Sequence, residues 1–366
     1  KLKTKVAIIG GGINGLMSAW KLSLQGYKVD LYESDIALSK TSSSSSKLLH
    51  GGIRYLEFGH INLVRQSLHD RHWWLKNARE FCNPIEMVMP IYKNSPRKKN
   101  ILFLGAYLYQ ILAGRFSLGK TKYLNYENTK NLCPELNSKN LIGAVSFFDA
   151  QMDEKKLGNW VLEQAVNSGV NVFENSKIDS FTQDGILHFQ GKNLEYSVII
   201  NAGGPWAYEL NKSNSIPTNF CLELVRGSHI VINNKVSNPY LIQELNNKRI
   251  VFILPYLGNT LIGTTEVIQN STDNISCSED EIDYLIKLYN ENIKDKIDYS
   301  NMVDKFSGLR PIVKRIYKNN LLNITSANRD AKIEVCNKML TIYGGKWTSA
   351  PSLADLVVKK VDSITR

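Results

Sequence analysis

Residues 6–15 of the chain read VAIIGGGING, and this stretch decides the fold. The short apolar run at residues 6–9 is typical of a strand that is buried on both faces of a sheet. The glycines that follow fit the pattern G-x-G-x-x-G. In this pattern Gly10 permits a tight turn, Gly12 lets a pyrophosphate approach the backbone, and Gly15 lets helix and strand pack closely. The stretch therefore predicts a βαβ unit that binds a dinucleotide at a helix N-terminus.

The residues that follow complete this unit. Apolar side chains recur with helical spacing over residues 13–25, and Gly26 ends the predicted helix. A second strand is predicted over residues 29–32, with Glu33 at its end. An acidic residue about 20 positions after the glycines is expected to bind a ribose hydroxyl, although an ordinary surface glutamate is the alternative. The fingerprint by itself does not separate FAD from NAD.

The same type of pattern returns near the middle and at the end of the chain. The expected elements are helices at 155–168 and 352–361 and strands at 170–173, 196–201 and 339–343. Other runs alternate or are apolar with no helix between them, namely 223–232, 249–254 and 260–263. They indicate an antiparallel sheet. The predicted fold class is therefore α/β, with a Rossmann-type cofactor-binding domain and an inserted, mainly antiparallel β domain.

The cofactor-binding domain is expected to be discontinuous, because its pattern brackets the antiparallel runs. A chain of 366 residues is longer than a single core usually carries, which agrees with two domains. The cofactor-binding domain is assigned to residues 1–80, 145–215 and 306–366. The remaining residues, 81–144 and 216–305, are assigned to a substrate or cap domain.

The formal net charge of +11 suits an anionic cofactor, an anionic substrate or an anionic surface. Nucleic acid is not expected as a partner, because the chain has no zinc finger, no aromatic-and-basic RNA-binding signature and no long basic arm. The five cysteines have no C-x-x-C spacing, which argues against a zinc ribbon or a dithiol redox motif. We therefore expect no metal site, and reduced thiols in a cytoplasmic protein.

Residues 101–114 (ILFLGAYLYQILAG) are the nearest candidate for a membrane segment. The run is shorter than the roughly 20 apolar residues that a spanning helix needs, so no transmembrane helix is predicted. Its basic flanks, Arg97, Lys98, Lys99 and Arg115, fit a helix that lies at a lipid interface. A buried helix is the alternative. A peripheral position at the inner face of the cytoplasmic membrane therefore stays open beside a cytoplasmic one.

Residues 45–57 (SSKLLHGGIRYLE) form the most informative block of the chain. The glycine pair allows close approach to a planar ring system. Arg54 beside Tyr55 is a good clamp for a phosphate or a carboxylate, although an ordinary salt bridge is the alternative for this arginine. The serine run at 42–46 leads directly into the block, so we interpret it as an ordered cofactor-binding turn.

This block resembles the signature of FAD-dependent, aerobic-type glycerol-3-phosphate dehydrogenases and the related glycerophosphate oxidases. Further short matches follow in the same order at residues 201–206, 225–231, 249–255, 262–266, 308–311, 329–330 and 343–348. The resemblance implies a D-amino-acid-oxidase-like flavoprotein with FAD as its cofactor. It also implies an oxidoreductase that converts sn-glycerol 3-phosphate into dihydroxyacetone phosphate by hydride transfer to flavin N5.

The resemblance further implies roles for individual residues. Positions that bind the substrate phosphate or line its pocket are Arg54, Tyr55, Thr264, Arg310, Arg329 and Lys346. Catalytic positions are His50, His229, Arg310 and Lys346, with His229 preferred as the base for the C2 hydroxyl proton. Positions around FAD are Gly10, Gly12, Ile13, Asn14, Gly15, Glu33, Ser45, Ser46, Lys47, Leu49, Gly51, Gly52, Ala202, Gly203, Trp206, Gly344, Gly345, Lys346, Trp347 and Thr348.

The sequence also departs from the family pattern. It ends soon after residues 344–348 and the helix that follows them, so we expect a short form without the helical C-terminal domain of the better-known dehydrogenases. Residues 348–351 read TSAP, and a basic residue near the pocket is missing there. Another phosphorylated polyol, a hydroxy acid or an amino acid therefore remains an alternative substrate. A flavin-binding protein without turnover is a further alternative, and the electron acceptor is either quinone or oxygen.

Overall fold

A largely parallel sheet contains the strand that precedes the glycine-rich turn. Its strand order is β19-β20-β11-β1-β2-β7. The bounds are β1 Lys5–Ile9, β2 Lys28–Tyr32, β7 Asn171–Phe173, β11 Val198–Asn201, β19 Lys332–Cys336 and β20 Met339–Tyr343. β1 pairs in parallel with β2 and with β11, and β11 pairs in parallel with β20. Strands from the start, the middle and the end of the chain thus share one sheet, as the sequence predicts.

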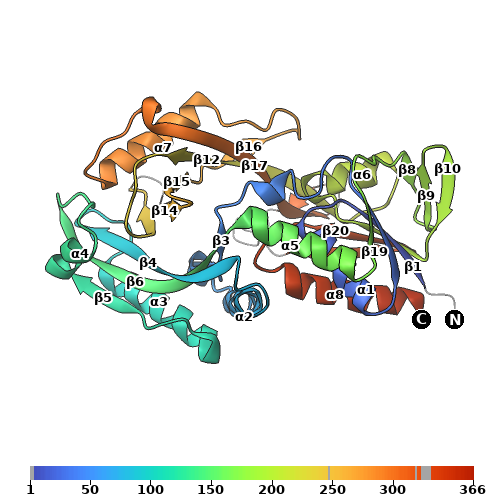
Figure 1. The fold of residues 1–366 in the computed structure, drawn as a ribbon, viewed down its shortest axis with the longest axis horizontal. Coiled ribbons are helices and arrows are strands. Elements are labelled where there is room, and N and C mark those ends of the chain that lie inside the picture. The colour runs from blue at the N-terminus through green and yellow to red at the C-terminus, as the bar shows by residue number, and fades with distance from the viewer. Residues whose placement is uncertain (1–3, 246–247, 318–319, 323–330) are drawn as a thin grey trace.

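Three helices cover this sheet in the computed structural model, which describes residues 4–245, 248–317, 320–322 and 331–366. They are α1 (Ile13–Leu24), α5 (Glu154–Asn167) and α8 (Ala350–Thr365), and α1 packs against the other two. Figure 1 shows them side by side next to β1 and β20. Their apolar faces bury Leu16, Val161 and Val357 in one cluster with the strand residues. Burying such a side chain contributes about 1.5–3 kcal/mol, so this packing fixes the turn at the N-terminus of α1.

A second sheet is long and mainly antiparallel, in the order β18-β17-β12-β15-β14-β13-β4-β6-β3. Its strands are β3 Leu48–Leu49, β4 Cys82–Tyr92, β6 Leu141–Met152, β12 Phe220–Ile232, β13 Tyr240–Gln243, β14 Ile250–Tyr256, β15 Asn259–Gly263, β17 Met302–Tyr317 and β18 Asn320–Leu322. Two more strands, β5 (Lys122–Asn125) and β16 (Val267–Gln269), pair with β6 and β12. The antiparallel pairing of β12, β15 and β14 confirms the antiparallel sheet that the sequence predicts for residues 223–232, 249–254 and 260–263.

Strands β4, β6 and β17 are absent from the sequence predictions. Residues 145–152 and 306–317 pair in the second sheet, whereas the sequence assigns them to the cofactor-binding domain. The domain boundaries given above therefore stay predictions. After β6 and after β17 and β18, the chain passes to strands of the first sheet, β7 and β19, so the two sheets are joined at these points.

The remaining elements lie around these two sheets. The helices are α2 Ile61–Asn77, α3 Lys99–Ala113, α4 Tyr126–Leu132, α6 Ala207–Ser213 and α7 Glu279–Asn292. A small separate sheet has the strands β8 Ser180–Phe181, β9 Ile186–Phe189 and β10 Lys192–Glu195. Short 3-10 turns occupy Thr41–Ser43, Ile53–Phe58, Gly114–Phe116, Gly204–Trp206 and Tyr299–Asn301.

Helix α3 corresponds to the apolar run at residues 101–114. One face packs into the core through Leu102, Ala106, Tyr109 and Ala113. The opposite face leaves Ile101, Leu104, Tyr107 and Ile111 exposed. Within the part of the chain that the structure describes, no helix is both long enough and apolar enough to cross a bilayer.

Candidate active site

A cavity of about 930 Å³ is lined by residues from both sheets and from the loops that connect them. It lies at the carboxyl end of β1, where open parallel sheets bind their ligands. Sites for small molecules span roughly 300–1,000 Å³, so this cavity is among the large ones. Its size suits an extended cofactor together with a small substrate.

The glycine-rich turn forms one wall of the cavity. At Gly10, φ is +108° and a Cβ atom would lie 2.5 Å from the Ala202 carbonyl oxygen. At Gly15 a Cβ atom would lie 2.0 Å from the Gly10 carbonyl oxygen, so helix and strand touch there. Gly12 lines the cavity, and the nearest atom to a Cβ there is the Ser42 Oγ at 3.3 Å. Gly10 and Gly15 therefore allow the close backbone approach that the fingerprint requires, and the approach of a pyrophosphate at Gly12 stays a prediction.

Glu33 lies at the edge of this wall. Its Oε2 accepts a hydrogen bond from the Gly11 amide at 2.7 Å, and its Oε1 accepts one from the Asp35 amide at 2.9 Å. The carboxylate is thereby fixed against the turn and lines the cavity. Ribose binding by Glu33 stays a prediction.

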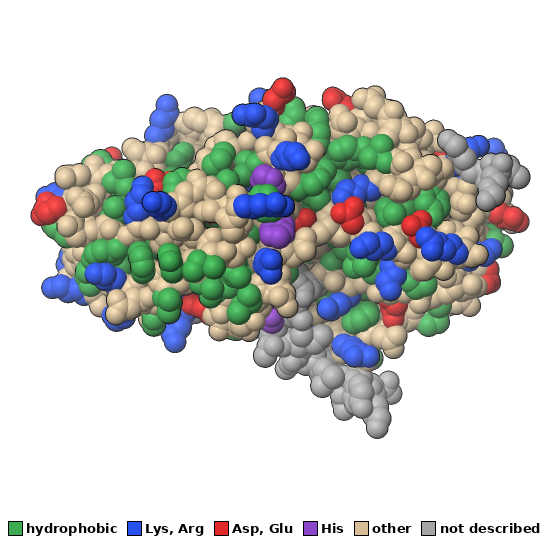
Figure 2. Space-filling view, turned by 90° about the horizontal axis from the view of Figure 1, so that it is seen from below, with side chains coloured by type: hydrophobic (Ala, Val, Ile, Leu, Met, Phe, Trp, Pro, Cys, Tyr) green, Lys and Arg blue, Asp and Glu red, His purple; other side chains and the backbone are tan. Residues whose placement is uncertain are grey.

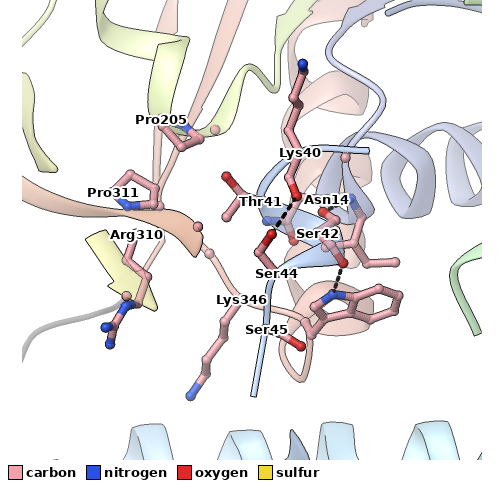
Figure 3. Close-up of a pocket in the computed structure, with 18 of the residues that line it drawn as sticks. Asn14, Lys40, Thr41, Ser42, Ser44, Ser45, Pro205, Arg310, Pro311 and Lys346 are labelled. Atoms are coloured by element: carbon pink, nitrogen blue, oxygen red, sulfur yellow. Dashed lines mark hydrogen bonds between the residues drawn. The ribbon is translucent and has the colours of Figure 1, made fainter. Parts of the chain in front are cut away.

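The serine run is an ordered loop, as predicted. The Ser42 Oγ accepts a hydrogen bond from the Ile13 amide at 3.0 Å, and the Trp347 indole donates to the Ser42 carbonyl oxygen at 2.9 Å. Figure 3 shows this loop, with Ser44 hydrogen-bonded to the Lys40 carbonyl oxygen. Buried Glu154, at the start of α5, binds the Ser45 hydroxyl and the Lys47 ammonium group. The loop is thus fixed to both α1 and α5.

Most of the predicted cofactor positions line the cavity. They are Gly10, Gly12, Ile13, Asn14, Glu33, Ser45, Ser46, Gly52, Ala202, Gly203, Trp206, Gly344, Gly345, Lys346, Trp347 and Thr348. Gly15, Lys47, Leu49 and Gly51 lie outside its lining. Lys47 does so because its ammonium group is buried in the ion pair with Glu154. Leu49 and Gly51 are buried as well, so these three residues lie behind the cavity wall and do not face the cavity.

The cavity wall contains buried polar atoms that have no hydrogen-bond partner within the described residues. Among the described residues, Asn14 Oδ1, Thr41 Oγ1 and Lys346 Nζ are buried without a hydrogen-bond partner, and all three side chains line the cavity. Buried polar atoms almost always have partners, so these atoms are suited to a bound polar group. Together with the glycine-rich turn at the helix N-terminus, they fit the pyrophosphate and ring system of FAD.

Arg310, on β17, presents its guanidinium to the cavity. The Nη2 atom donates to the Thr265 carbonyl oxygen at 2.8 Å, and Nη1 lies 3.6 Å from Glu266 Oε1. A Cβ atom at Gly227 would lie 2.4 Å from Nη2, so this glycine makes room for the guanidinium. Figure 3 shows Arg310 and Lys346 extending toward the same side of the cavity, away from Asn14.

Arg249 and Glu266 also line the cavity, although no role was predicted for either. Arg249 donates to the Thr264 carbonyl oxygen at 2.9 Å, and its Nε lies 3.5 Å from Glu266 Oε2. The Glu266 carboxylate thereby bridges Arg249 and Arg310. Both residues lie in stretches that resemble the family, residues 249–255 and 262–266. This resemblance is the one feature of the sequence that indicates them as site residues.

The predicted substrate residues Arg54, Tyr55 and Lys346 line the same cavity. The Lys346 Nζ lies 4.9 Å from the centre of the Tyr55 ring, a cation–π distance. Thr264 lines the cavity next to Arg310. Arg329 lies outside the described residues. The cavity wall therefore carries several cations, two of which, Arg249 and Arg310, are bridged by Glu266.

The two candidate bases both line the cavity. His229, on β12, is only 3% exposed, and its Nε2 lies 2.9 Å from the Ser46 Oγ. Burial, followed by the charges of Lys47 and Arg310, holds the pKa of His229 well below 6.5. The imidazole is therefore neutral at neutral pH. The His50 amide donates to the Thr348 Oγ1 at 3.0 Å, which fixes the backbone of the loop that carries it.

Comparisons with known proteins agree with this geometry. A family model described as FAD dependent oxidoreductase matches residues 5–359. D-erythritol 1-phosphate dehydrogenase of Brucella abortus is 30% identical over 95% of this chain and 71% of its own length. Aerobic glycerol-3-phosphate dehydrogenase of Escherichia coli is 28% identical over 98% of this chain and 74% of its own length.

Solved structures show the same fold. The glycerol-3-phosphate dehydrogenase from Bacillus halodurans complexed with FAD aligns with a TM-score of 0.77 at 21% identity, over 99% of this chain and 65% of that one. Glycine oxidase from Bacillus cereus aligns with a TM-score of 0.76 at 16% identity, over 99% and 95%. The predicted D-amino-acid-oxidase-like fold and the FAD cofactor are confirmed. The chain belongs to the family of FAD-dependent oxidoreductases.

Proposed function

We propose that the chain oxidises sn-glycerol 3-phosphate to dihydroxyacetone phosphate, with another phosphorylated polyol as the alternative substrate. The observation that carries the proposal is that four cations, Arg54, Arg249, Arg310 and Lys346, line one cavity, with Arg249 and Arg310 bridged by Glu266. A phosphate dianion needs several cations, and arginine forks match its oxygens. The carboxylate of an amino acid would need a single clamp. Relatives named for glycerol 3-phosphate and D-erythritol 1-phosphate support the same substrate class.

In this proposal the cations hold the phosphate and thereby orient the C2 carbon of the substrate. Arg310 is fixed by the Thr265 carbonyl oxygen and by Glu266, so its fork is already in place before the substrate binds. His229 accepts the C2 hydroxyl proton at Nε2, through the Ser46 hydroxyl that lies 2.9 Å from it. Bound FAD would supply the hydride acceptor, its N5 atom.

Anaerobic mixing of the FAD-loaded protein with sn-glycerol 3-phosphate tests this function. We expect bleaching of the oxidised flavin absorbance band with this compound and none with glycerol or with amino acids. Bleaching by D-erythritol 1-phosphate alone would support the alternative polyol. A flavin that stays oxidised with every phosphorylated polyol would contradict the proposal.

The pH dependence of catalysis tests the role of His229. Because burial lowers its pKa well below 6.5, the neutral, proton-accepting form persists into mildly acidic solution. The acid limb of the pH profile of kcat/KM should therefore lie below pH 6.5. Replacing His229 by Asn should lower kcat by about 10²–10⁴-fold and remove that limb. The matched control is His188→Asn in β9, outside the cavity lining, which should keep the wild-type profile.

We also propose that α3 seats the protein on an anionic lipid surface, which would give access to a quinone acceptor. Ile101, Leu104 and Ile111 recur with helical spacing and are 58%, 67% and 54% exposed. Lys98, Lys99 and Arg115 flank this row. Figure 2 shows hydrophobic side chains gathered on this face, with Lys and Arg side chains around them. An apolar row with a basic rim suits the boundary between headgroups and acyl chains.

Vesicle binding tests this surface. Replacing Ile101 and Ile111 by Ser should weaken binding to vesicles that contain anionic lipid by about tenfold or more, because each isoleucine loses its apolar burial. Ile268→Ser in β16 serves as the control, because Ile268 is at least as exposed as Ile101 and Ile111 but lies on the opposite side of the molecule from α3 (Figure 1). Sedimentation with the vesicles measures both. Equal vesicle binding by all variants would show that α3 does not form the contact surface, whereas no binding by any of them, the wild type included, would contradict a lipid-bound state.

A further inference from the structure

Three polar side chains are buried together beneath the loop that carries His50 and Arg54. They are Arg71 on α2, Tyr109 on α3 and Asp149 on β6, and each is almost fully buried. The Asp149 Oδ1 accepts hydrogen bonds from the Arg71 Nη1 at 2.9 Å and from the Tyr109 hydroxyl at 2.8 Å. None of the three lines the cavity, so none can touch the cofactor or the substrate directly.

The loop itself rests on this group through one backbone amide. The Gly51 N–H donates to the Tyr109 hydroxyl at 2.6 Å. Because Tyr109 gives its own proton to Asp149, its oxygen presents a lone pair to Gly51. The preceding amide, that of His50, donates to the Thr348 Oγ1. Two consecutive amides are therefore held, one by the turn after β20 and one by α3.

The contact between Gly51 and Tyr109 leaves no room for a side chain at residue 51. A Cβ atom at residue 51 would lie 2.7 Å from both the Tyr109 hydroxyl and the Leu68 Cγ. The next residue, Gly52, has a φ of +76° and lines the cavity. The backbone is thus fixed at the point where the chain turns into the 3-10 segment with Arg54 and Tyr55.

Stability alone does not account for such a group. A buried ion pair can often be replaced by apolar side chains of similar volume at no loss of stability, whereas breaking one leaves a costly unpaired charge. We propose that Tyr109, oriented by Asp149 and Arg71, is a positioning residue that fixes the Gly51 amide and thereby holds the 50–55 loop against the cofactor. That the loop is held against FAD rests on family membership. That the same loop also helps to bind the substrate, through Arg54 and Tyr55, rests on the proposed function.

Tyr109→Phe tests this inference, with Tyr107→Phe as its control on the exposed face of the same helix. Losing the acceptor of a buried amide should speed FAD release from the diluted holoenzyme by about tenfold or more, measured as a rise of flavin fluorescence. The half-saturating substrate concentration in anaerobic reduction should rise by a similar factor, with less effect on the limiting rate. Tyr107→Phe should match the wild type in both.

A purely structural role would give a different result. It would lower the thermal midpoint of Tyr109→Phe and leave FAD release and half-saturation unchanged, which would overturn the inference. If Tyr109→Phe does not fold, Asp149→Asn provides the second variant, because it keeps the shape and one acceptor oxygen. It should speed FAD release relative to the wild type, and an unchanged release rate would also overturn the inference. FAD release is independent of the substrate, so failure here is distinguishable from failure of the glycerol 3-phosphate proposal.

Discussion

Replacing Arg310 by alanine is expected to lower kcat/KM for sn-glycerol 3-phosphate by roughly 100- to 1,000-fold while FAD stays bound. Two effects act in the same direction. The variant loses the guanidinium fork that would bind the phosphate. It also leaves the Glu266 carboxylate, which lies 3.6 Å from the Arg310 Nη1, with less positive charge beside it. That carboxylate would then repel the incoming phosphate.

Anaerobic flavin reduction at several substrate concentrations measures this effect. Arg310→Lys should recover part of the loss, because it restores the charge but not the planar fork. Arg315→Ala is the matched control, since Arg315 stands on the same strand and is exposed. If Arg310→Ala reduced its flavin with the wild-type concentration dependence, the phosphate would have to bind elsewhere and these cavity cations would not form the substrate site.

Replacing Gly12 by valine is expected to remove FAD from a protein that still folds. Gly12 has a φ of −74° and a ψ of 177°, which other residues adopt without strain. No described atom lies closer than 3.3 Å to a Cβ there, so the side chain would project into the cavity. Overlap with the cofactor should weaken FAD binding by about 10- to 100-fold or more. Gly10→Val should instead prevent folding, because its Cβ would meet the Ala202 carbonyl oxygen.

The ratio of flavin to protein absorbance after purification measures this effect, and far-ultraviolet circular dichroism reports the fold. Gly105→Ala is the control, because it also adds side-chain bulk to a glycine but meets no atom within 4 Å. A Gly12→Val protein that purifies with the full amount of FAD would place the pyrophosphate away from this turn. An unfolded Gly12→Val protein would show that the residue is structural.

The sequence by itself determined the first βαβ unit and its glycines. Both depend on local properties, namely the apolar periodicity of neighbouring residues and the backbone angles that glycine alone adopts easily. The block at residues 45–57 similarly gave the histidine, the arginine and the tyrosine that line the cavity. Its resemblance to a known family supplied FAD, which neither periodicity nor spacing could have done.

Only the tertiary structure decided which of these residues face the cavity. Lys47 pairs with Glu154, 107 positions away, and Tyr109 holds Gly51, 58 positions away. Such contacts depend on how β6 pairs with β3 and how α3 packs beneath them, and no local pattern encodes this pairing. The same holds for the Glu266 bridge between Arg249, which directly precedes β14, and Arg310 on β17. For α3, periodicity predicts a helix, but the core against which it packs decides which apolar face is buried and which remains at the surface.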